Sequence, residues 1–290
     1  MMKRMDSIFE RLKQMHPDLA KYATMTEKEL IESNVQSFNE TEGDKHLIDG
    51  YNCDICRNKG FVSRIRTRQD LRGTEIYEEY LTECNCTKVR KSIMRMKRSG
   101  MEELFKKYKF ENYTITEPWQ KMIKEKAQNF ANAPAPVFFI GGQSGTGKTH
   151  LCTAIARQLL FDGNELRYIL WRDESVKLKS AVNNDEKYQS LIAELKRVDV
   201  LYIDDFLKVP IGQDTSKPTS ADLAVALEII NNRYNAKLIT IISSEWTIKD
   251  IIGMDEALGG RIYEMAGAEY SANIGKDPKK NYRIKDIVEL

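Results

Sequence analysis

The chain has 290 residues, 41% of them hydrophobic, which is enough to bury the core of one large domain or two unequal ones and excludes a disordered protein. Its 45 basic and 43 acidic residues leave a net charge of +2, which by itself favours no class of partner. Charges are scattered through the first residues, and no apolar run reaches the length of a membrane span. We therefore expect neither a signal peptide nor a membrane anchor, but a cytoplasmic protein that binds no membrane.

Residues 1–50 carry a helical pattern followed by a polar stretch. Apolar side chains recur at spacings of three and four residues at Ile8, Leu12, Met15 and Leu19. The stretch "NETEGDKH" then interrupts this pattern. We expect a helical N-terminal arm over this part of the chain.

Residues 51–87 contain four of the five cysteines, as one C-x-x-C pair and one C-x-C pair. These are Cys53, Cys56, Cys84 and Cys86. The segments "FVSRIRTR" and "TEIYEEYL" between the two pairs alternate in polarity and predict a β-hairpin. Thiol pairs in a reducing compartment hold metal rather than form disulfides, so we predict a module in which the four cysteines bind a structural Zn²⁺. Because C-x-C is less usual than C-x-x-C, His46 is an alternative ligand, and four unrelated thiols are the other alternative.

Residues 88–131 are expected to form a basic helical linker. Nine basic and two acidic side chains lie between residues 88 and 109. This run could follow a phosphate backbone, with Arg64, Arg66 and Arg68 of the hairpin extending it. A solvated helical face is an equally good interpretation.

Residues 132–290 have the texture of an α/β domain. Prolines end the preceding helix, and four apolar runs then alternate with helical patterns such as "THLCTAIARQLL". The predicted strands cover residues 137–140, 166–171, 200–205 and 238–243. Continuous apolar strands that alternate with helices predict a parallel sheet covered by helices on both faces. Cys152 falls on an apolar helical position and is expected to pack in the core.

The stretch "GGQSGTGKTHL" follows the first of these strands and satisfies G-x-x-x-x-G-K-T. Its glycines let backbone N–H groups turn inward around phosphate oxygens, and the helix that starts there directs its positive end at the anion. We expect Lys148 to neutralise the phosphates of ATP and Thr149 to bind Mg²⁺ through its hydroxyl. The expected nucleotide-binding residues are Gly142, Gln143, Ser144, Gly145, Thr146, Gly147, Lys148, Thr149 and His150.

The run "VLYIDDF" supplies two acids at the end of a buried strand. Asp204 is expected to bind Mg²⁺, and Asp205 to polarise the attacking water, which favours hydrolysis over simple nucleotide storage. A pair of acids that merely ends a strand is the alternative.

Together these motifs resemble the AAA+ ATPases of the bacterial DnaC/DnaI helicase-loader group, including its phage and mobile-element versions. The pieces "ITIISSEWTIKDII", "GGRIYEM" and "KNYRIK" extend the resemblance over most of the chain. It implies an AAA+ P-loop domain that hydrolyses ATP, self-association through that domain, a DnaB-like helicase partner and single-stranded DNA. Relatives also often carry a comparable cysteine-bearing amino-terminal module.

The resemblance implies further site residues. The sensor 1 tip, which reads the γ-phosphate, falls at Ser243, Ser244 or Glu245, with Ser244 the predicted nucleotide contact; Glu245 departs from the Asn of many relatives. Arg261 matches the arginine finger that enters a neighbouring subunit's site, and Arg283 matches the sensor 2 arginine. For each arginine the alternative is a surface ion pair. An extra helix that contacts single-stranded DNA is implied around Arg172, Lys177 and Lys179.

The function implied is ATP-dependent loading of a replicative hexameric helicase onto single-stranded DNA. An IstB-like transposition helper, which shares the ATPase motifs but works with a transposase and duplex DNA, is the nearest alternative. A P-loop kinase and a non-hydrolysing scaffold are the alternatives from other classes.

Overall fold

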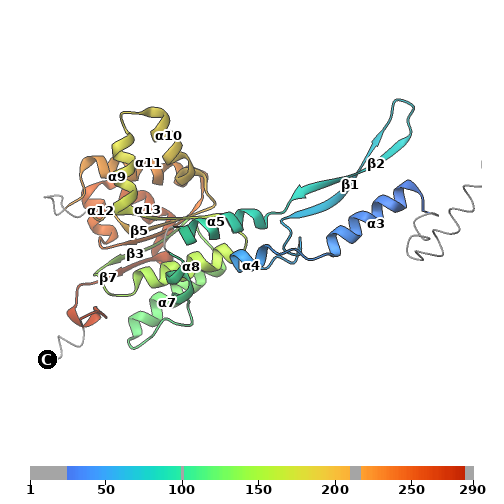
Figure 1. The fold of residues 1–290 in the computed structure, drawn as a ribbon. Coiled ribbons are helices and arrows are strands. Elements are labelled where there is room, and N and C mark those ends of the chain that lie inside the picture. The colour runs from blue at the N-terminus through green and yellow to red at the C-terminus, as the bar shows by residue number, and fades with distance from the viewer. Residues whose placement is uncertain (1–24, 99–100, 210–216, 285–290) are drawn as a thin grey trace, which may run out of the picture. The chain divides into compact units, whose positions relative to one another are not determined.

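The computed structural model describes residues 25–98, 101–209 and 217–284, and the chain divides into two compact units, residues 1–90 and 91–290 (Figure 1). Each unit is described by itself. The predicted apolar repeat from Ile8 to Leu19 lies outside the described residues. No helix among the described residues is long and apolar enough to cross a membrane.

The first unit is built on a hairpin that a helix supports. Its elements are α3 (Glu27–Glu40), α4 (Lys45–Asp49), β1 (Phe61–Gln69), β2 (Glu75–Glu83) and the start of α5 (Cys86–Arg98). The strands β1 and β2 pair antiparallel, with Phe61 opposite Glu83, which confirms the predicted hairpin. The Asn39 side chain at the end of α3 donates to the carbonyl of Ser63 and accepts from its N–H, at 2.9 and 3.0 Å. This pair of hydrogen bonds joins α3 to β1.

The second unit contains a five-stranded sheet in the order β4-β5-β6-β3-β7, with every pair parallel. Its strands are β3 (Val137–Gly142), β4 (Leu166–Leu170), β5 (Val200–Phe206), β6 (Ile239–Ser244) and β7 (Ser271–Ile274). The four predicted strands and their parallel arrangement are confirmed. The sequence did not predict β7, and Trp171, expected to end a strand, instead begins a helix.

Helices cover both faces of this sheet (Figure 1). They are α6 (Glu102–Lys107), α7 (Pro118–Asn132), α8 (Lys148–Phe161), α9 (Trp171–Ala181), α10 (Asp185–Arg197), α11 (Ser220–Ala236), α12 (Ile248–Met254) and α13 (Glu256–Tyr270). Phe139 of β3 joins the core that α9 to α13 form, whereas its neighbour Phe138 contacts Phe130 of α7. Because successive strand residues point to opposite faces, α7 lies on the other side of the sheet. The predicted α/β fold is therefore confirmed.

A buried guanidinium secures the amino-terminal edge of the sheet. Arg233 of α11 is fully buried and donates to the carbonyls of Leu195, Val198 and Ile239 at 2.9, 3.0 and 2.6 Å. It also donates to the hydroxyl of Thr240 at 2.9 Å. These bonds satisfy carbonyls at the end of α10 and at the first residue of β6, and so fix the start of the strand whose other end reaches the candidate site.

Candidate nucleotide site and cysteine cluster

The turn between β3 and α8 depends on three glycines with left-handed backbone angles. Gly142, Gly145 and Gly147 have φ values of 122°, 77° and 85°. A side chain on Gly142 would strike the Ile274 carbonyl of β7, and a Cβ on Gly147 would lie 2.9 Å from the Tyr113 ring. Only glycine, which has no Cβ, adopts these positive φ values and also fits so close to neighbouring atoms. The loop therefore brings its amides close to the start of α8, as the motif predicts.

A cavity of about 420 Å³ opens beside this loop, within the size range of small-molecule sites. Seven of the predicted nucleotide-binding residues, 144–150, line it, together with Asp205, Glu245 and Arg283. The side chain of Gln143 is used elsewhere: it donates to the Asp277 carbonyl at 2.9 Å and accepts from the Asp277 N–H at 2.6 Å. The chain near its described end is thus fastened to the loop.

Lys148 is held inside the loop. Its ammonium donates to the carbonyls of Gly142 and Gln143, at 2.8 and 2.7 Å, and its side chain is buried. Burial lowers the pKa of Lys148 from its ordinary value. A cation that is desolvated and fixed by two carbonyls is ready to meet an anion in the cavity at little ordering cost.

Buried Asp204 contacts Thr149, which lines the cavity. The Thr149 hydroxyl donates to Oδ1 of Asp204 at 3.1 Å, and the Ser243 hydroxyl donates to the same oxygen. Burial raises the pKa of Asp204, because its charged form loses water. A carboxylate and a hydroxyl side by side are oxygen donors of the kind that Mg²⁺ prefers, so the two residues fit a magnesium site.

Asp205 follows in a left-handed turn, with φ of 53°. Its carboxylate accepts from the Lys208 ammonium at 3.0 Å, and Lys208 donates to Glu245 at 3.0 Å as well. Although burial acts to lower it, the hydrogen bonds to Glu245 and Asp205 raise the pKa of Lys208. All three side chains line the cavity.

The three candidates for the sensor 1 tip occupy different places. Ser243 contacts Asp204, as described, and Glu245 lines the cavity. Ser244 does not line it: its buried hydroxyl donates to the Phe206 carbonyl at 2.8 Å and accepts from the Trp246 N–H at 3.0 Å. Ser244 thus connects the ends of β5 and β6.

Tyr108 and Tyr113, which no sequence motif marks, form one wall of the cavity with His150. His150 stacks on Tyr108, with ring centroids 4.7 Å apart, and meets the edge of Tyr113 at 5.2 Å. The buried Tyr113 hydroxyl has no hydrogen-bond partner among the described residues. Flat rings and an unsatisfied hydroxyl beside a phosphate loop suit a nucleotide base. No sequence pattern marks Tyr108 or Tyr113, because only the tertiary fold brings residues 108–113 to the loop.

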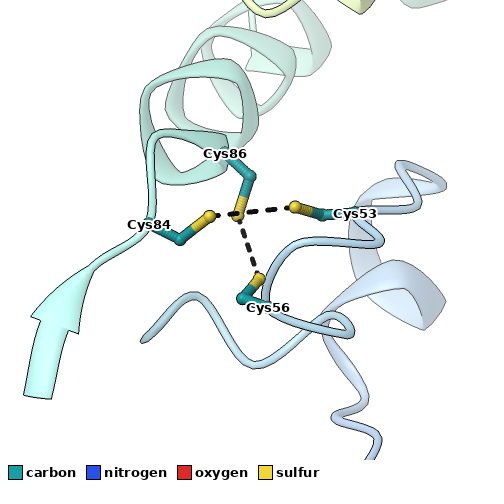
Figure 2. Close-up of side chains that lie close together, drawn as sticks. All are labelled: Cys53, Cys56, Cys84 and Cys86. Carbon is teal, nitrogen blue, oxygen red and sulfur yellow. Dashed lines mark hydrogen bonds between the residues drawn. The ribbon is translucent and has the colours of Figure 1, made fainter. Parts of the chain in front are cut away.

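In the first unit, the four predicted cysteines converge. Their sulfur atoms all lie within 4.8 Å of one another, with Cys53 and Cys84 at 3.8 Å and Cys56 and Cys86 at 3.5 Å (Figure 2). A tetrahedron with zinc–sulfur bonds of about 2.3 Å has sulfur–sulfur edges of about 3.8 Å, so the cluster fits Zn²⁺. All four are free thiols, and His46 is not part of the cluster.

Local structure and a second layer of contacts hold the cluster. After Cys56 the chain turns through left-handed residues, and the Gly60 N–H donates to the Cys56 sulfur at 3.2 Å. Asn58 accepts from the Cys53 N–H at 2.9 Å and from the Arg90 guanidinium at 2.9 Å. Arg90 also donates to Asp49 at 2.6 Å. Such outer contacts orient ligands around a metal.

Comparison with known proteins adds a family to this geometry. The family described as "IstB-like ATP binding protein" matches residues 73–258, which is more than half of the chain. The chain belongs to this IstB-like family. Among its relatives is protein YqaM of Bacillus subtilis, 30% identical over 226 residues that cover 74% of this chain and 70% of YqaM. The phage-like element PBSX protein XkdC of the same organism is 28% identical over 82% of this chain and 88% of XkdC.

Proteins named for helicase loading are also similar to this IstB-like chain. The replicative helicase loader DnaC of Buchnera aphidicola subsp. Baizongia pistaciae is 31% identical over 58% of this chain and 66% of DnaC. A solved structure of the DnaC helicase loader is 19% identical, with a TM-score of 0.48, over 60% of this chain and 98% of that one. The crystal structure of DnaI is 17% identical, with a TM-score of 0.47, over 62% of this chain and 93% of the DnaI chain. The sequence matches confirm the predicted family, whose description is that of ATP-binding proteins.

Arg261 of this IstB-like protein lies away from the nucleotide cavity. It is on α13, where its guanidinium donates to the Ala257 carbonyl at 3.0 Å and lies 5.9 Å from the centre of the Tyr234 ring. It lines a separate hollow with Tyr234 and Glu264. The structure therefore does not bring Arg261 together with the other predicted site residues of its own subunit.

The basic run between residues 88 and 109 contains many ion pairs. Arg95 pairs with Glu165 and Glu194 at 3.3 and 2.6 Å, and Lys106 pairs with Glu102 at 3.0 Å. On the hairpin, Glu78 pairs with both Arg66 and Arg68. Several of the basic side chains that were expected to contact phosphates are thus paired with carboxylates of the protein itself.

Proposed function

We propose that the protein is an ATP-hydrolysing helicase loader of the DnaC type, which places a DnaB-like hexameric helicase on single-stranded DNA at replication initiation. The observation that carries this proposal is that Lys148, Thr149 and Asp205 line one cavity, with Asp204 hydrogen-bonded to Thr149, in a chain whose relatives include proteins named DnaC. Lys148 would neutralise the phosphates, and Thr149 and Asp204 would hold Mg²⁺. The bound ion would reduce the negative charge of the phosphates. Asp205 would accept a proton from the attacking water.

The same proposal assigns Arg261 and Arg283 to different subunits' sites. Arg283 lines the cavity of its own chain, which suits a sensor 2 contact with nucleotide. Arg261 lies outside that cavity and is partly exposed, which suits insertion into the site of a neighbouring copy. Hydrolysis would then require self-association through the ATPase domain, because a finger arginine stabilises the charge of the transferring phosphoryl group.

The proposed division of labour follows the predicted domains. Residues 1–50 would form a helical arm, 51–87 a zinc module, 88–131 a helical linker and 132–290 the ATPase domain. The amino-terminal parts would bind the helicase, and the ATPase domain would contact single-stranded DNA. Zn²⁺ held by the cysteine cluster would stabilise a module that has little apolar core of its own.

Complex formation tests the proposal. We expect the purified protein to bind the replicative helicase of its own cell in the presence of ATP and Mg²⁺, and the complex to disassemble as ATP is hydrolysed. Size-exclusion chromatography with light scattering would follow both steps, with Lys148→Ala as the control that lacks nucleotide. A helicase that stays unbound under every nucleotide condition would contradict the proposal.

The family match favours a second candidate, an IstB-like transposition helper that acts with a transposase on duplex DNA. Competition between duplex and single-stranded oligonucleotides of equal length separates the two. A loader should prefer the single strand, whereas filament formation on the duplex would favour the helper.

A further inference from the structure

Lys208 lines the nucleotide cavity but belongs to none of the sequence motifs. It follows the acidic pair of β5 and lines the main cavity and the adjoining one, as does Glu245. Its ammonium lies 3.0 Å from an oxygen of Asp205 and 3.0 Å from an oxygen of Glu245. Lys208 is a second cation beside the phosphate loop, in addition to Lys148.

The backbone around Lys208 is fixed by the adjacent strand end. The Lys208 N–H donates to the Asp205 carbonyl at 3.0 Å, which closes a turn. The carbonyl of buried Leu207 accepts from the Trp246 indole at 3.2 Å, and that of Phe206 accepts from the Ser244 hydroxyl. The ends of β5 and β6 therefore present the lysine at a defined place.

The Lys208 ammonium can make one further contact with an anion. The carboxylates of Asp205 and Glu245 share the Lys208 ammonium. Without that cation, the two negative charges would repel a phosphate. An ammonium has three N–H donors, and two of them are directed at Asp205 and Glu245. The third can serve an oxygen in the cavity that all three side chains line.

We propose that Lys208, anchored by Glu245, contacts the terminal phosphate of ATP and so allows the site to distinguish ATP from ADP. This inference rests on the proposed nucleotide site. It gives a role to Glu245: the carboxylate does not contact the phosphate but holds the cation that does. Lys148 would serve the phosphates that both nucleotides share, and Lys208 the one that only ATP has.

The test is the ratio of ATP to ADP affinity, measured by calorimetry with Mg²⁺ for each variant. A charged hydrogen bond is worth a factor of about ten or more, so Lys208→Met should lower ATP affinity about tenfold and leave ADP affinity unchanged. Lys208→Arg keeps the charge and should retain most of the preference for ATP. Glu245→Gln should weaken the preference, because the cation loses an anchor.

Lys276→Met is the matched control. Lys276 lines only the adjoining cavity, so its removal takes away a nearby positive charge without this contact. Two results would overturn the inference while the proposed function stands. Either Lys208→Met has the same ratio of ATP to ADP affinity as the wild type, or Lys276→Met lowers this ratio as much as Lys208→Met does. Wild-type protein that bound neither nucleotide would overturn both.

Discussion

The hydroxyl of Thr149 donates a hydrogen bond to Oδ1 of Asp204 across 3.1 Å, which joins the first turn of α8 to the carboxyl end of β5. The two residues are 55 positions apart in sequence. Their contact brings a hydroxyl that follows the phosphate loop to a buried carboxylate, and so places several oxygen atoms next to the cavity that Thr149 lines.

Removal of the Asp204 charge should abolish most of the effect of Mg²⁺ on nucleotide binding. Asp204→Asn keeps the shape and the contact with Thr149, but an amide is a much weaker magnesium ligand than a carboxylate. We expect ATP affinity with Mg²⁺ to fall about tenfold or more, and affinity in EDTA to change little. Titration of a fluorescent ATP analogue measures both. Asp173→Asn, at an exposed carboxylate of α9, is the control, and unchanged Mg²⁺ dependence in Asp204→Asn would argue against the assignment.

The cysteine cluster should hold one Zn²⁺ per chain. Cys84→Ser removes one of the four converging thiols and should lower the zinc content to near zero, because a tetrahedral thiolate site tolerates little loss of ligands. Metal analysis of the purified protein by mass spectrometry checks this. Cys152→Ala, which removes the buried thiol of α8, should keep the full zinc content. Wild-type protein that is folded and free of metal would refute the site.

Arg261→Ala should inactivate the subunit's neighbour rather than the subunit itself. An arginine finger contributes about 10³-fold or more to hydrolysis, so the variant alone should release almost no phosphate. Mixed with Lys148→Ala, which keeps its finger but lacks the phosphate-binding cation, it should regain a readily measured rate. Arg157→Ala, at an arginine that lies over the Phe161 ring on α8, is expected to be fully active. Two folded variants that stay inactive when mixed would exclude a finger role.

His150 should make the protein less stable in mild acid. Burial lowers the pKa of His150 below its ordinary value of 6.5, so between these two pKa values the unfolded chain binds more protons than the native protein. The free energy of unfolding should therefore fall as the pH drops through this interval. His150→Phe keeps a ring for Tyr108 and Tyr113 but cannot be protonated, and should show a smaller fall between about pH 7.5 and about pH 5.5 in urea denaturation. An equal fall in both proteins would contradict this account.

The parts of the site that depend on local backbone were predictable from sequence. The glycines of the phosphate loop, Lys148 and Thr149 lie within eight residues, and their arrangement follows from a strand, a tight turn and a helix start. The strands β3, β5 and β6 were predictable because their apolar runs are buried on both sides, whereas β4 is shorter and partly exposed. By contrast, β7 is only four residues long and follows a kink at Gly267. It contains no run of apolar residues from which a strand could be predicted.

The parts that depend on tertiary contacts were not predictable. The sequence left three candidates at the sensor 1 tip, because alternation in a strand shows that Ser243 and Ser244 face opposite ways but not which one faces the site. The role of Lys208 depends on Glu245, 37 residues away. The Tyr108 and Tyr113 wall likewise forms only when a segment outside the sheet packs on α8.

The most direct test of the central claim is helicase loading itself. A closed circle of single-stranded DNA admits a hexameric ring only if the ring is opened, so the amount of helicase retained on such circles after removal of free protein measures loading. We predict that ATP and the wild-type protein together increase this amount several-fold, while Lys148→Ala and ADP do not. Retention that is the same with and without the protein, in a preparation that hydrolyses ATP, would contradict the proposed function.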